Sequence, residues 1–105
     1  MELEIIWAEF SEFQLDKIFE YYKKEANFDI ALEIIEGILN EPEILRKNPF
    51  VGQKEPLLKE RTIEYRYLVY KSFKIIYSVD EKNAKIKIAD VFGTRQFPDK
   101  IKRKK

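Results

Sequence analysis

The chain has 105 residues, 20 of them Lys or Arg and 19 Asp or Glu, so its formal net charge is +1, and 45% of its residues are apolar. This composition indicates one folded domain and excludes a disordered chain, which would lack the eight Phe and six Tyr found here. The absence of Cys and His excludes disulfides, thiolate zinc sites, cysteine nucleophiles and the commonest general acid–base group. No apolar run approaches the ~18 residues of a membrane span. We therefore expect a soluble, cytoplasmic protein with no metal and no cofactor.

The first elements of the chain have the patterns of a short strand and a helix. Leu3, Ile5 and Trp7 alternate with their neighbours, which predicts a short N-terminal strand. Ser11 and Gln14 have the spacing of a capping box, which predicts a helix start at Ser11. An apolar stripe of about four helical turns follows, formed by Leu15, Ile18, Phe19, Tyr22 and Ala26.

A second amphipathic helix follows almost without a loop. We expect Asn27 to end the first helix and to cap the second. The second stripe runs from Ala31 to Leu39, and Pro42 stops or kinks the helix. Two amphipathic helices joined this closely form a helical hairpin.

The second half of the chain has the pattern of a sheet. Three runs rich in aromatic and β-branched residues predict strands within Thr62–Tyr70, Phe73–Val79 and Lys85–Phe92. Turns are expected at Lys71-Ser72 and Asp80–Ala84. The predicted fold is therefore α+β, in the order β-α-α-β-β-β, with the helical hairpin on one face of a small antiparallel sheet.

The charges are divided unevenly along the chain. Residues 1–60 contain 14 acids and 7 bases, whereas residues 61–105 contain 5 acids and 13 bases. A single domain over residues 1–105 is expected, with a basic tail at residues 99–105 that need not be ordered. The basic half can attract phosphates or an acidic partner, although a lysine-rich tail more often only improves solubility.

Two candidate functional residues are a carboxylate and a lysine. Glu55 lies within Gly52–Leu57, just before the sheet, and a carboxylate there can act as a general base, although an exposed, inert Glu is the commoner outcome. Lys74 alternates with Phe73 and Ile75, so it lies on the opposite face of its strand. There it is either a cation on an open sheet face or a solvated lysine.

Two arginines are further candidates. Arg66 lies between two tyrosines and can bind phosphate or stack on a base, or it can be a structural Arg whose head group pairs with a carboxylate. Arg95 follows the last predicted strand, where a guanidinium can stabilise charge on a phosphate, or it is an ordinary surface Arg. Glu55, Lys74 and the two arginines together suit phosphodiester chemistry or anion binding.

Five segments, taken in order and spacing, resemble one protein family. They are Ile18–Tyr22 with its paired tyrosines and the later Ala31, Asn48–Gly52, Tyr65–Leu68, Phe73–Asp80 and Ile88–Gln96. These segments resemble the ParE tyrosine and alanine pattern, the connector after the second helix, the two central strands and the last strand of the RelE/ParE superfamily of bacterial type II toxins. The resemblance implies a toxin of a plasmid stabilisation or addiction system that is held silent by a cognate antitoxin.

Single residues can be compared with two branches of the family. RelE- and YoeB-like members cut mRNA on the ribosome with the RNA 2′-hydroxyl as nucleophile, and the resemblance places Glu55, Lys74 and Arg95 at catalytic positions of these nucleases. Lys74 stands where these nucleases have an arginine. The positive charge is kept, but the guanidinium fork that donates two parallel hydrogen bonds is lost. ParE-like members poison DNA gyrase, and Arg66 resembles an arginine at the start of a ParE strand. Residues 96–105 contain neither the Tyr nor the His that nucleases use near the C-terminus.

Three hypotheses follow from the resemblance. The first is a ParE-like growth inhibitor that acts on DNA gyrase, with Arg66, Lys74 and Arg95 as target- or anion-binding residues. The second is a ribosome-dependent mRNA interferase with Glu55, Lys74 and Arg95 as catalytic residues. The third is a degenerate member that only binds its antitoxin. The antitoxin is expected to place acidic residues near the basic half, or else to bind the apolar helical hairpin.

Overall fold

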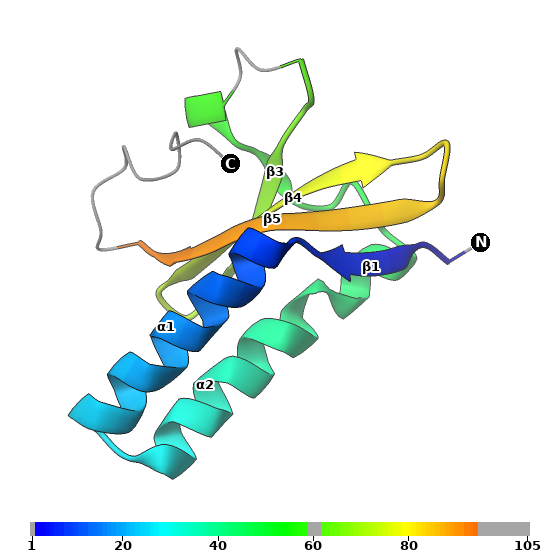
Figure 1. The fold of residues 1–105 in the computed structure, drawn as a ribbon. Helices are drawn as coiled ribbons and strands as arrows, with labels where there is room; N and C mark the ends of the chain where they lie inside the picture. Colours follow the sequence, from blue (N-terminus) through cyan, green and yellow to red (C-terminus); the bar gives the residue numbers. More distant parts are fainter. Residues whose placement is uncertain (1, 59–61, 95–105) are drawn as a thin grey trace.

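The computed structural model describes residues 2–58 and 62–94 (Figure 1). The elements are β1 (Glu4–Trp7), α1 (Glu9–Glu25), α2 (Phe28–Asn40), the 3₁₀ helix η1 (Glu41–Arg46), β2 (Gln53–Lys54), the 3₁₀ helix η2 (Pro56–Leu58), β3 (Arg66–Tyr70), β4 (Phe73–Asp80) and β5 (Lys85–Gly93). The α+β fold is confirmed, with the helical hairpin followed by an antiparallel meander. The predictions for Arg95 and for the tail at residues 99–105 lie outside the described residues.

The helix boundaries agree with the sequence pattern at two of three places. Asn27 caps α2, because its Oδ1 accepts a hydrogen bond of 2.8 Å from the N–H of Ile30, and α2 ends just before Pro42. The capping box at Ser11 is wrong: Ala8 is the N-cap of α1, and the buried Ser11 hydroxyl donates to the Ala8 carbonyl at 2.6 Å. The chain turns into the helix earlier because the Ala8 N–H is still bonded to Ile88 of β5.

Within the described residues, the sheet has five strands in the order β1-β5-β4-β3-β2. The pairs β2–β3, β3–β4 and β4–β5 are antiparallel, but β1 pairs with β5 in parallel, from Glu4 opposite Lys85 to Trp7 opposite Ile88. The sheet is therefore mixed rather than wholly antiparallel. An alternating pattern shows which side chains share a face and does not show the direction of a neighbouring strand.

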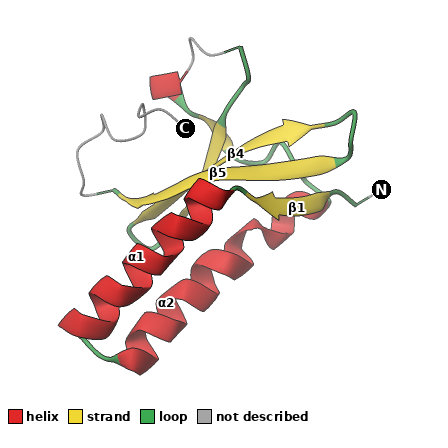
Figure 2. Cartoon of the chain, in the orientation of Figure 1, coloured by secondary structure: helices red, strands yellow, loops and turns green. Residues whose placement is uncertain are grey.

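Both helices cover the same face of the sheet, and the opposite face has a smaller apolar cluster (Figure 2). The main core lies between the helices and the sheet and includes Leu15, Ile38, Ile75, Tyr77 and Ile88. The smaller cluster lies on the face away from the helices and consists of Leu58, Ile76 and Phe92, with Tyr65 and Tyr67 packed against it. We call this second face the open face.

A bulge between β4 and β5 lets both Ile88 and Val91 enter the main core and leaves Asp90 on the open face. The register shifts between Ile76 and Tyr77, so Ile76 lies opposite Asp90 whereas Tyr77 lies opposite Ile88.

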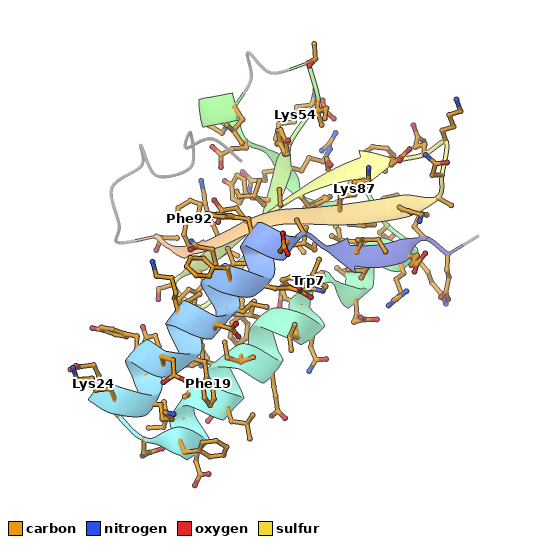
Figure 3. The ribbon with its side chains drawn as sticks, viewed as in Figure 1. Trp7, Phe19, Lys24, Lys54, Lys87 and Phe92 are labelled. Atoms are coloured by element: carbon orange, nitrogen blue, oxygen red, sulfur yellow. The ribbon has the colours of Figure 1, made fainter. Side chains whose placement is uncertain are left out.

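In Figure 3, Trp7 lies between β1 and the helices, whereas Lys54 lies beyond the sheet on the side away from them. No helix in the described part of the chain is long and apolar enough to cross a membrane.

Candidate functional site

The open face contains an ion pair between a buried carboxylate and a partly exposed lysine. Lys74 lies on β4 and points away from the core that contains Phe73 and Ile75, as its alternation predicts. Its Nζ lies 2.8 Å from Oε1 of Glu55, which follows β2. Glu55 is only 2% exposed, so it is not the exposed glutamate that composition alone favours. The backbone N–H of Glu55 donates to the Tyr65 carbonyl at 2.9 Å, which holds this residue against the start of β3.

An apolar and aromatic layer surrounds the ion pair. The Lys74 ammonium lies 4.1 Å from the centroid of the Tyr67 ring, a distance at which a cation–π interaction is favourable. Ile76 and Phe92 of the open-face cluster flank it on the sheet. Such surroundings strengthen the attraction between the two charges, and they also make either charge costly to leave without its partner.

A second carboxylate on this face was missed by the sequence reasoning. Asp90 is 1% exposed and lies opposite Ile76 in the ladder. Gln14 of α1 donates weakly to its Oδ1 at 3.5 Å and to the Val91 carbonyl at 3.2 Å, so the start of α1 is bonded to the edge of β5. The sequence does contain a signal that could have identified Asp90, because it is the one acid in the otherwise apolar stretch of residues 88–92.

Arg66 is held by backbone carbonyls. Its Nη1 donates to the carbonyls of Phe50 at 3.2 Å and Gly52 at 2.8 Å, and its Nη2 lies 3.2 Å from a carboxylate oxygen of Glu64. Its guanidinium carbon lies 5.2 Å from the centroid of the Phe50 ring. Its Nε is buried and has no hydrogen-bond partner within the described part of the chain. These contacts place Arg66 at the connector between η1 and β2, away from Lys74.

Tyr77 reaches the same connector from the core. Its side chain is fully buried, and its hydroxyl donates to the Pro49 carbonyl at 2.8 Å and accepts from the Gly52 N–H at 3.0 Å. Burial raises the pKa of the Tyr77 hydroxyl above its usual value, although the N–H of Gly52 acts in the opposite direction.

The structure therefore brings two of the four predicted site residues together. Glu55 and Lys74 form one pair, Arg66 lies at the connector, and Arg95 is outside the described residues. Within the described residues there is no group of three or more acidic side chains that could hold a metal ion.

Comparisons with known proteins show the fold. No protein-family model matches the sequence, and no curated protein matches it by sequence. Among solved structures, a chain of the chromosomal ParDE toxin–antitoxin system from P. aeruginosa matches with a TM-score of 0.72 and 19% identity, over 88% of this chain and 96% of that one. A chain of the toxin–antitoxin complex RelBE2 from Mycobacterium tuberculosis matches with a TM-score of 0.63 and 13% identity, over 89% and 99% of the two chains. This chain therefore has the same fold as these two chains.

Proposed function

We propose that this chain is the toxin of a bacterial type II toxin–antitoxin system, that it acts in the cytoplasm and that a cognate antitoxin neutralises it. The two similar structures named above come from toxin–antitoxin systems, and the matches span almost the whole of those chains. At 19% and 13% identity this likeness supports the fold. The activity must therefore be argued from the residues of the site.

Within this class we favour a ParE-like growth inhibitor that acts on DNA gyrase without cutting nucleic acid. The supporting observation is the burial of Glu55, whose carboxylate is bound by the Lys74 ammonium at 2.8 Å. A general base must come within hydrogen-bond reach of the proton that it removes. Glu55 would first have to leave both its buried position and its ion pair. The chain also has no His, and residues 96–105 have no Tyr, to serve as the general acid.

The second candidate is a ribosome-dependent mRNA interferase. It is favoured by the proximity of Glu55 and Lys74, the two described positions that the family resemblance assigns to catalysis. In this function RNA would enter above Tyr67 and displace the ammonium from the carboxylate. Glu55 would then accept the proton of the 2′-hydroxyl as that oxygen attacks the phosphorus, with Lys74 facing the scissile phosphate. The bond to the 5′-oxygen would break, and the leaving oxygen would take a proton from solvent.

The contacts of Arg66 and Lys74 also limit where an acidic antitoxin segment can bind. Arg66 and Lys74 each have a carboxylate partner, Glu64 and Glu55 respectively. An acidic antitoxin segment at these two residues would have to compete with those partners. The other predicted contacts, Arg95 and the tail, lie outside the described residues.

Regulated expression in a bacterial host tests the proposal. We expect growth arrest with gyrase-linked DNA breaks and an SOS response, and we expect Glu55→Gln to retain both in proportion to the amount of folded protein. Glu20→Gln is the matched control, since it removes an exposed pair with Lys23. Cuts in translated mRNA that disappear in Glu55→Gln but not in the control would favour the interferase instead. Folded protein that binds its antitoxin but never arrests growth would indicate a degenerate member.

A further inference from the structure

The connector from Pro49 to Gly52 has no regular structure, yet four of its backbone groups are bonded to side chains from the sheet. Tyr77 of β4 binds the Pro49 carbonyl and the Gly52 N–H. Arg66 of β3 binds the carbonyls of Phe50 and Gly52. Two side chains on neighbouring strands therefore hold both ends and the middle of a four-residue loop. We call these two side chains and their four bonds the connector clamp.

The clamp needs the backbone to lie directly on the sheet, and Gly52 allows this. A Cβ atom at Gly52 would lie 2.7 Å from the carbonyl oxygen of Tyr67 and closer still to the hydroxyl of Tyr77. The Tyr67 oxygen belongs to the backbone of a paired strand and cannot move aside without disturbing the β2–β3 ladder. Any residue larger than glycine would therefore lift the connector away from Tyr77 and Arg66.

Glu55 depends on this connector for its position. Only two ladder pairs, Gln53 with Tyr67 and Lys54 with Arg66, lie between Gly52 and Glu55. Even with the bond from the Glu55 N–H to the Tyr65 carbonyl, so short a strand has few hydrogen bonds to determine its own placement. We propose that Tyr77 and Arg66 are positioning residues, which act through the connector to bring Glu55 to Lys74.

The fork of Arg66, rather than its charge, is what this role requires. Its side chain is only 16% exposed, and its two terminal nitrogens are directed at two carbonyls and at Glu64. A lysine would keep the charge but cannot donate in these directions at once. Arg66→Lys therefore tests the guanidinium geometry separately from the charge, because it leaves any contact that needs only a positive charge in place.

Nuclear magnetic resonance of isotope-labelled protein tests the clamp without any assumption about function. Tyr77→Phe removes both hydroxyl bonds while the ring remains, and Tyr70→Phe is the matched control because no hydrogen bond of the Tyr70 hydroxyl is found in the described structure. In Tyr77→Phe we expect about tenfold faster exchange of the Gly52 amide. We also expect shifts of the Glu55 carboxyl and Lys74 side-chain signals, with α1 and α2 unchanged. Arg66→Lys should shift the same signals, and this variant replaces Tyr77→Phe in the test if Tyr77→Phe does not fold.

Perturbation confined to Pro49–Gly52, with the Glu55 and Lys74 signals in place, would overturn the proposal. So would equal shifts in the Tyr70→Phe control.

A growth assay extends the test and rests on the proposed toxin function. If the clamp presents the active conformation, Arg66→Lys should lose growth arrest as fully as Arg66→Gln at equal levels of folded protein. Full arrest by Arg66→Lys together with loss in Arg66→Gln would assign Arg66 to charge recognition and refute its role in the clamp. If the wild-type chain does not arrest growth, the proposed function fails, and the spectroscopic result still decides the clamp.

Discussion

Replacing Gly37 with alanine should destabilise this protein, although the same change usually stabilises a helix. Gly37 lies inside α2, where alanine is favoured over glycine by about 1 kcal/mol. Here an added Cβ would overlap Cζ and Oη of Tyr70, whose ring lies on the helix backbone and packs against the main core. The ring must strain or swing away, and overpacking of this kind costs about 1–3 kcal/mol.

The net effect is a loss of about 1 kcal/mol in the free energy of unfolding. For a domain of this size that loss lowers Tm by about 4–8 °C. Urea denaturation followed by circular dichroism measures it. The decisive comparison is a double-mutant cycle: in a Tyr70→Ala background, where the obstructing ring is gone, Gly37→Ala should stabilise by about 1 kcal/mol. If Gly37→Ala stabilised the wild-type chain as well, the contact between Tyr70 and the helix backbone would be refuted.

Three further predictions concern the ion pair, the Tyr77 hydroxyl and the N-cap of α2. Lys74→Met should lower the free energy of unfolding by about 1–3 kcal/mol, because it removes one partner of the buried Glu55 carboxylate, and combining it with Glu55→Leu should recover part of the loss, as measured by urea denaturation. The raised pKa of Tyr77 means that its contribution to stability is complete below about pH 10 and is lost as pH rises through the folded-state pKa; melting curves of the wild type and of Tyr77→Phe should therefore differ in their alkaline slopes. Asn27→Ala should cost about 1 kcal/mol, and retention of full stability would refute the cap.

Local patterns predicted the elements well where the deciding interactions are local. The stripes of α1 and α2, the Asn27 cap and the stop before Pro42 depend on residues a few positions apart. The face of Lys74 followed from the period of two along a strand. The failure at Ser11 is consistent with this, because a contact with Ile88 determines where α1 begins.

The candidate site could be predicted only in part. The residue types at positions 55, 66 and 74 marked a charged site, but their partners could not be inferred from spacing. Arg66 is bonded to carbonyls 14 and 16 residues earlier in the chain. Asp90 went unnoticed because spacing does not show which distant residue approaches an acid within a strand, here Gln14 of α1 at 3.5 Å.

The sequence by itself determined the helical hairpin, the three long strands and the side of the sheet on which Lys74 lies, since these follow from periodicity and from turn residues. Only the tertiary structure decided that β1 runs parallel to β5, that Glu55 is buried, and that Glu55 and Lys74 form a pair 19 residues apart. The physical reason is that hydrophobic periodicity specifies which face of an element is buried. Strand direction, burial of a charge and the choice of its partner depend on which distant segments pack together.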